Sequence, residues 1–126
     1  MDTHSDDRGY ITDIFVKKNM NHACLIKSWK GAVRGNHYHK MTTQYTYMIS
    51  GEMEYYWRNM IGSDSSPVQS RIIGPGDLVM SDPFEIHAMK CLSPHGCTFI
   101  AFAEGPRGGE EYESDTFRVP SIIPNE

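Results

Sequence analysis

The chain has 126 residues, of which 39% are hydrophobic and 22% are charged, a size and composition typical of a single globular domain with one well-filled core. Sixteen acidic and twelve basic residues give a net charge of −4, so we expect no nucleic-acid surface, although local cations can still bind an anionic substrate. Three cysteines without a CxxC pair argue against a disulfide framework. The absence of a long apolar stretch or a signal peptide predicts a cytoplasmic protein without membrane contact.

Short β-strands separated by turns are predicted along the whole chain. Residues 1–9 are a polar lead-in, which is either flexible or clamped along a sheet edge, and residues 105–126 form an acidic tail after a glycine-rich break. Residues 61–67 have the composition of an exposed loop, and the sequence Gly-Pro-Gly-Asp at 74–77 is a strong turn signal. β-branched and aromatic content or alternating polarity predicts strands over residues 10–16, 23–29, 44–49, 52–60, 68–73, 78–80, 85–91 and 97–103. About eight strands, with a turn roughly every ten residues and no helical period, indicate an all-β single domain, either an antiparallel sandwich or a small barrel.

The stretch from residue 31 to residue 51 contains the strongest candidate site. His37 and His39 are two residues apart, so on an extended strand both imidazoles point to the same face. Gln44 follows after a short polar run that predicts a turn, and it begins the next strand. A hairpin of these two strands would bring two imidazoles and one amide together.

A third histidine, His87, lies on the predicted strand 85–91. If it joins His37, His39 and Gln44, three imidazoles and one oxygen donor would match the ligand set of Zn, Fe, Mn, Ni or Cu. Spacing along the chain does not show that they converge, and polar residues on a solvent-facing strand are the alternative. Arg34 and Lys40 flank the pair, either as solvated surface charge or as a clamp for a pyrophosphate or carboxylate.

The spacing of these residues resembles the cupin superfamily. Gly31, five residues, His37-x-His39, four residues, Gln44, six residues and Gly51 reproduce the first cupin motif, with glutamine where a glutamate is usual. The second motif is matched more loosely by the segment from Gly76-Asp77 through Pro83 to His87. The resemblance implies a double-stranded β-helix, the cupin jelly roll, over a single domain spanning residues 1–126. It also implies that His37, His39, Gln44 and His87 hold a divalent transition metal, which a neutral Gln44 would retain less strongly than a carboxylate.

A narrower resemblance is to the nucleotide-sugar 3,4-ketoisomerases, which include the WxcM-like proteins and lie near the RmlC-type epimerases. It is carried by Asp7-Arg8-Gly9, by the run from Arg34 to Gln44, and by the Glu-Tyr-x-x-Asp-x-Phe of residues 111–117. It implies proton transfer beside the carbonyl of a dTDP-linked keto-deoxysugar, with His37 and His39 as the catalytic pair and Arg34 as a substrate contact. His87 departs from this pattern, because these ketoisomerases generally work without a metal.

Three functions therefore remain open: an isomerase or epimerase of a nucleotide-linked keto-deoxysugar in polysaccharide biosynthesis, a metal-dependent cupin oxygenase, and a non-catalytic cupin that binds a small ligand. The resemblance also implies a homodimer. The aromatic residues of the segment 52–57 would suit its interface or, equally, the core of a monomer.

Overall fold

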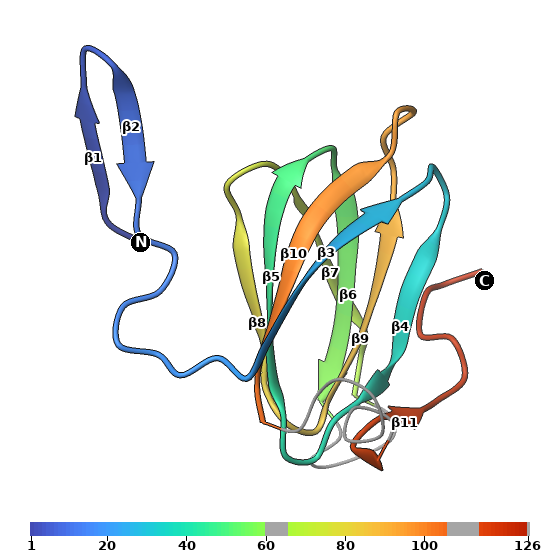
Figure 1. Cartoon of the computed structure of the whole chain (residues 1–126). Coiled ribbons are helices and arrows are strands. Elements are labelled where there is room, and N and C mark those ends of the chain that lie inside the picture. Colours follow the sequence, from blue (N-terminus) through green and yellow to red (C-terminus); the bar gives the residue numbers. More distant parts are fainter. Residues whose placement is uncertain (60–65, 106–113, 126) are drawn as a thin grey trace.

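The computed structural model describes residues 1–59, 66–105 and 114–125, which form two facing sheets and a separate hairpin (Figure 1). The strands are β1 (Thr3–Asp6), β2 (Gly9–Thr12), β3 (His22–Ser28), β4 (Val33–Tyr38), β5 (Thr43–Ser50), β6 (Met53–Asn59), β7 (Gln69–Ile73), β8 (Leu78–Ser81), β9 (Glu85–Cys91), β10 (Cys97–Glu104) and β11 (Phe117–Arg118). One sheet has the order β3-β10-β5-β8 and the other β11-β4-β9-β6-β7, and every pairing is antiparallel. Within the described residues, no helix has the length and apolar character needed to cross a bilayer.

The space between the two sheets holds the main hydrophobic core. Met48, Cys97 and Phe99 enter it from the sheet that contains β5 and β10, and Met53, Tyr55, Ile73, Met89 and Cys91 enter from the other sheet. Because alternate residues of each strand face this space, β10 reads as a strict alternation of buried and half-buried positions. Two antiparallel sheets closed over one core are the all-β jelly roll that the sequence predicts.

The predicted strands are confirmed except at the N-terminus, and the last residue of the predicted strand 52–60 lies outside the described residues. The segment predicted as a strand over 10–16 stops at Thr12, because β2 pairs only with β1 and the chain then runs as an irregular linker to β3. The predicted lead-in over 1–9 is the greater part of that hairpin. Most of the predicted loop 61–67 lies outside the described residues.

The described part of the predicted acidic tail packs on the domain. β11 pairs with β4 through Phe117–Tyr38 and Arg118–His37, and Ile122 and Ile123 are buried. These two isoleucines form a second cluster with Ile86 and Ala88, on the side of β9 that faces away from the main core. The C-terminal segment therefore covers the outer face of its sheet.

The aromatic residues of the segment 52–57 serve the interior of one chain. Tyr55 is 2% exposed in the main core, Trp57 packs against that core, and Tyr56 packs against the second cluster. Tyr56 and Trp57 are half-buried, so these side chains serve chiefly the core of a single chain.

Candidate active site

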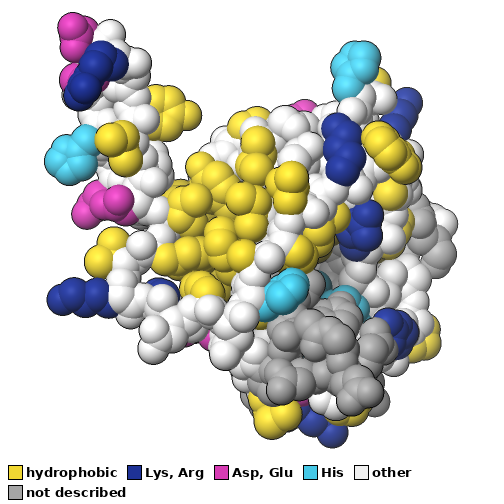
Figure 2. Space-filling view, in the orientation of Figure 1, with side chains coloured by type: hydrophobic (Ala, Val, Ile, Leu, Met, Phe, Trp, Pro, Cys, Tyr) yellow, Lys and Arg dark blue, Asp and Glu magenta, His cyan; other side chains and the backbone are white. Residues whose placement is uncertain are grey.

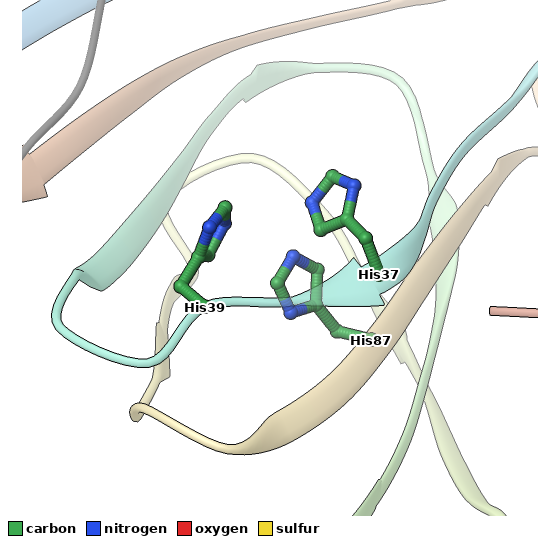
Figure 3. A group of neighbouring side chains, drawn as sticks. All are labelled: His37, His39 and His87. Atoms are coloured by element: carbon green, nitrogen blue, oxygen red, sulfur yellow. The ribbon is translucent and has the colours of Figure 1, made fainter. Parts of the chain in front are cut away.

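Three histidines from two paired strands meet in the interior at one end of the core (Figure 3). His37 on β4 is paired in register with His87 on β9, and His39 follows one residue after β4. The ring centroid of His37 lies 4.9 Å from that of His39 and 4.8 Å from that of His87. One possible ligand nitrogen from each of the three rings lies within 4.8 Å of the other two. The structure thus brings together the three imidazoles that the sequence singles out.

A β-bulge at Gly35 and Asn36 decides which side chains of β4 face this interior. Gly35 is paired with Ala88 and His37 with His87, so Asn36 is an extra residue without a counterpart on β9. Asn36 has a positive φ of 56°, and its carbonyl and side-chain oxygens accept amide hydrogens from the C-terminal segment. The extra residue changes the alternation along β4, so Arg34 and His37, three positions apart, both line the same pocket.

Gly35 permits the close contact of the two histidine-bearing strands. Its φ of 99° lies in a region that side chains disfavour, and a Cβ placed on it would lie 2.6 Å from the carbonyl oxygen of His87. The separation of β4 and β9 at this point, and hence the distance between His37 and His87, depends on the absence of a side chain at position 35.

His39 is oriented by the backbone of the C-terminal segment. Its Nδ1 lies 2.7 Å from the carbonyl oxygen of Asp115, which can only accept, so Nδ1 carries the hydrogen and Nε2 carries the lone pair. The Nε2 atom of His39 and both ring nitrogens of His87 are buried. A nitrogen lone pair held in this way is suited to coordinate a metal or to accept a proton.

The carboxylate of Asp115 fixes the turn that carries His39. It accepts hydrogen bonds from the backbone amides of Lys40 and Met41 and from the hydroxyl of Thr42, at 2.9, 3.1 and 2.7 Å. Burial alone would raise the pKa of the Asp115 carboxyl, but these hydrogen bonds outweigh it and hold the pKa below its ordinary value of 3.8. The ionised form of Asp115 is therefore the one that holds the turn.

We expect Asp115→Asn to lower the free energy of unfolding by about 1–3 kcal/mol, because the amide keeps one acceptor and points a donor at backbone amides that also donate. Since the folded pKa of Asp115 lies below its unfolded value, its stabilisation is complete above about pH 4 and is lost as the pH falls through the folded value. Urea unfolding of both proteins from neutral pH to pH 3 should show a constant difference that shrinks only in acid. An unchanged stability at neutral pH would contradict this role.

A pocket of about 310 Å³ opens beside the histidines and carries positive charge. Its lining residues come from both sheets: Ile26, Val33, Arg34, Gly35, His37, Gln44, His87, Met89, Phe99 and Arg118. Gln44 is 5% exposed and lines this pocket from β5. The predicted hairpin is wrong, because β4 and β5 belong to opposite sheets and do not pair, so the amide reaches the imidazoles from the facing sheet. Among the described lining residues there are two arginines and no carboxylate, which makes this part of the pocket attractive to an anion in a chain whose net charge is −4.

The two arginines of the pocket differ in their contacts, and only Arg34 is predicted from the sequence. The Arg34 Nε donates to the hydroxyl of Ser28 at 2.8 Å, and one Nη donates to the carbonyl of Lys27 at 3.1 Å. Arg118 reaches the pocket because β11 pairs with β4 beside His37. Sequence reasoning misses Arg118, because nothing in the tail signals that it forms a strand against β4.

Lys40, the other predicted substrate contact, lies elsewhere. Its ammonium nitrogen is 4.3 Å from the centroid of the Phe117 ring, a cation–π contact, and Lys40 is not among the residues that line the pocket. Its role in substrate binding stays a prediction, with less geometric support than that of Arg34.

A tyrosine and a carboxyl group pack behind His87 and were not predicted from the sequence. The Tyr55 ring lies parallel to the His87 ring at 6.3 Å between centroids, and the Tyr55 hydroxyl hydrogen-bonds to Ser81 and donates to Glu85 at 3.0 Å. Burial raises the pKa of Tyr55 and that of Glu85 above their ordinary values, so the tyrosine stays protonated at neutral pH. The Tyr55 ring therefore lies alongside the His87 ring.

The chain has the jelly-roll fold of the RmlC-like cupins. Among solved structures, the chain is similar to the 4-keto-6-deoxy sugar epimerase NovW from Streptomyces spheroides, with 16% identity over 97% of this chain and 67% of that one and a TM-score of 0.77. It is also similar to a 3,4-ketoisomerase from Helicobacter canadensis, with 18% identity over 94% and 86% of the two chains and a TM-score of 0.73. At these identities, the likeness establishes the shared fold.

The chain belongs to the polysaccharide biosynthesis C-terminal domain family, whose model matches residues 4–89. The capsular polysaccharide assembling protein CapF from Staphylococcus aureus shares the fold, with 16% identity over 94% of this chain and a TM-score of 0.70. The present chain spans about one third of the length of CapF, 32% of that chain. No match was found among curated protein sequences.

Proposed function

We propose that the chain is an isomerase or epimerase that acts on a nucleotide-linked keto-deoxysugar in polysaccharide biosynthesis. The observation that carries the proposal is the convergence of His37, His39 and His87 beside a cationic pocket, in a member of a polysaccharide biosynthesis family. NovW and the Helicobacter ketoisomerase, whose fold the chain shares, act on keto-sugars or carry out ketoisomerisation according to their names.

The reaction that this pocket suits is proton transfer at a carbon beside a carbonyl. A base removes that proton to give an enediol, and an acid returns a proton to a neighbouring carbon or to the opposite face. Imidazole suits both steps, because histidine side chains ordinarily titrate near neutral pH. His37 is half-buried and lines the pocket, and His39 presents Nε2 as the acceptor, so these two residues are the proposed catalytic pair.

We also propose a divalent transition metal at this site, either Zn, Fe, Mn or Ni, held by His37, His39, Gln44 and His87. The donor set fits, because three imidazole nitrogens lie within 4.8 Å of one another and Gln44, whose amide oxygen is a possible fourth ligand, lines the same pocket. When bound, the metal would polarise the substrate carbonyl and stabilise the enediolate. A coordinated nitrogen no longer accepts protons, so the metal content decides whether His37 and His39 are ligands or bases.

The same cluster supports a second candidate, a metal-dependent cupin oxygenase, because His87 completes a three-histidine set that the ketoisomerase pattern lacks. Iron-dependent oxygen consumption with a keto-deoxysugar would favour it. Ligand-dependent stabilisation without turnover, even with metal supplied, would instead favour a non-catalytic binding cupin.

The direct test is incubation with a dTDP-4-keto-6-deoxysugar in deuterated water. We expect a new sugar isomer, with deuterium incorporated at the carbon beside the carbonyl. NMR and mass spectrometry detect both. His39→Ala should lower the rate of exchange at least about 100-fold, the usual contribution of a general base. Absence of both product and exchange, with and without added metal, would end the isomerase proposal.

Arg34 and Arg118 are the proposed contacts of the substrate diphosphate. Replacing either with Met should weaken the binding of dTDP by about 10- to 100-fold, because each guanidinium supplies charge-assisted hydrogen bonds to phosphate. Isothermal titration calorimetry of each variant is the measurement, with Lys30→Met as a matched loss of charge outside the pocket. Lys40→Met should bind dTDP as the wild type does if Lys40 only contacts Phe117, and more weakly if Lys40 is a substrate contact, as the sequence predicts. Wild-type affinity in both arginine variants would contradict the assignment.

A further inference from the structure

His22, at the start of β3, is a histidine that neither the sequence motifs nor the site described above include. The burial of β3 alternates along the strand, and its half-buried side chains are His22, Cys24 and Ile26. Ile26 lines the pocket beside the histidines. Because alternate residues of a strand share a face, His22 lies on the same inward face of β3 as Ile26.

The strand register places His22 level with Gln44 on the inner face of this sheet. His22 is paired with Ala103 on β10, and Ala103 is paired with Gln44 on β5. Gln44 lines the pocket, and Ala103 is fully buried with only a methyl side chain. A single small residue therefore separates the imidazole of His22 from the amide of Gln44, on the sheet that faces the three histidines.

The ring of His22 has a buried nitrogen that the rest of the described chain leaves without a partner. Its Nδ1 atom is buried and forms no hydrogen bond to any described residue. The preceding residue fixes the start of the strand: the amide of Asn21 donates to the carbonyl of Ala103, and the side-chain oxygen of Asn21 accepts from the amide of Gly105, both at 2.8 Å. A buried polar atom without a partner costs free energy, so a ring held in this way is suited to meet a polar ligand.

The surroundings of β3 suit a sugar that is attached to a diphosphate. Among the described strands, β3 pairs only with β10, so it is the edge of its sheet. Figure 2 shows histidine side chains that reach this face of the molecule close to Lys and Arg side chains. Arg34 and Arg118, the proposed diphosphate contacts, line the same pocket as Ile26 of β3. A sugar bound next to that diphosphate would lie between β3 and the histidine cluster.

His22 lies apart from the three converging histidines. The group whose possible ligand nitrogens lie within 4.8 Å of one another consists of His37, His39 and His87 and does not include His22. A nitrogen that coordinates a metal does not accept protons, so His37 and His39 serve either as ligands or as bases. His22 can transfer a proton in both cases.

We propose that His22 is a further acid–base residue of this site, which exchanges a proton with the keto-sugar from the sheet opposite His37 and His39; the inference rests on the proposed function. A base on one side takes the proton beside the carbonyl, and the electron pair of that C–H bond forms the double bond of an enediolate. The protonated imidazole of His22 then gives its proton from the other side, to the same carbon or to its neighbour, and a carbonyl forms again. Exchange with solvent returns both groups to their starting states, and the reverse direction uses them in the opposite order.

The variant His22→Asn tests this role when product formation and solvent exchange are measured separately. A dTDP-4-keto-6-deoxysugar is incubated in deuterated water, and NMR follows both the new isomer and the deuterium in the recovered starting sugar. We expect the variant to form the isomer at least about 100-fold more slowly, the usual contribution of a general acid or base. Deuterium uptake into the starting sugar should continue near the wild-type rate, because the remaining base can still remove and return a proton on one side. His95→Asn makes the same substitution in an exposed turn and should change neither rate.

The possible outcomes separate this inference from the proposed function. Product formation at the wild-type rate in His22→Asn would overturn the role of His22 and leave the isomerase proposal intact. Equal loss of product and exchange would also overturn it, because His22 would then serve binding or folding. A wild-type chain that shows neither product nor exchange would overturn the proposed function, and the role of His22 with it.

A measurement on the wild-type chain does not depend on the folding of any variant. With isotope-labelled histidines, dTDP-glucose, which has no keto group to react, should shift the NMR signals of the His22 ring. Addition of dTDP alone should leave these signals in place, because the proposed contact of His22 is with the sugar. Signals of His22 that do not respond to dTDP-glucose, while those of His37 do, would overturn the contact.

Discussion

Replacement of Gly35 by alanine should destabilise the fold at the site, because the added methyl group has no room between β4 and β9. The alanine would have to adopt a φ of 99°, which residues with a side chain disfavour. Its Cβ would lie 2.6 Å from the carbonyl oxygen of His87 and 3.0 Å from the Cα of Ala88. Both neighbours are backbone atoms, so the overlap is relieved only if β4 moves away from β9. We expect a loss of about 2–4 kcal/mol in the free energy of unfolding, from backbone strain and the displaced strand together. The register between His37 and His87 would be lost with it.

Gly31→Ala provides the matched control for this prediction. Gly31 also has a positive φ, of 80°, but a Cβ there would meet no atom within 4 Å. Its variant should therefore lose only about 1 kcal/mol, the cost of the backbone conformation alone. Thermal and urea unfolding of the two variants should separate them clearly. Equal stability losses would show that the close contact at Gly35 does not hold the strands.

Replacement of His87 by alanine should abolish the proposed metal binding. His87 is 1% exposed and lies between His37 and the stacked ring of Tyr55, so its removal takes away one of three converging nitrogens. Loss of one such ligand should weaken the affinity for Zn²⁺ or Ni²⁺ at least about 100-fold. A metal that binds the folded wild-type chain at 1,000 times its dissociation constant stabilises it by about 4 kcal/mol, so the melting temperature should rise with metal only in the wild type.

The variant His95→Ala makes the same substitution outside the site. His95 is exposed in the turn between β9 and β10, and its variant should bind metal and respond to it as the wild type does. The response should also fade as the pH falls below about 6, because protonated imidazoles do not coordinate. If His87→Ala were stabilised by metal as strongly as the wild type, the metal would be bound elsewhere.

Local patterns in the sequence predict most of this architecture. Alternating polarity and turn residues give the strands from β3 to β10, and the spacing of His37 and His39 gives two imidazoles on the same side. The cupin spacing adds Gln44 and His87, which belong to other strands. Each of these inferences depends on residues near one another in the chain or on a known motif.

The remaining parts of the site depend on contacts between distant segments, which no local pattern shows. The bulge at Asn36 shifts the alternation of β4, so Arg34 and His37 line one pocket although regular alternation would separate them. Asp115 binds the turn that follows β4, although it lies 75 residues beyond Lys40 in the chain. Local spacing cannot indicate a contact over this separation. Arg118 enters the pocket only because β11 pairs with β4.

The proposed site is tested most directly by elemental analysis of the chain purified without a polyhistidine tag. After exposure to each candidate divalent metal at neutral pH and removal of the excess, we predict about one equivalent of a single transition metal per chain, as expected for one site with three histidine ligands. Less than a tenth of an equivalent with every metal offered would contradict the metal site. It would leave His37 and His39 as an acid–base pair.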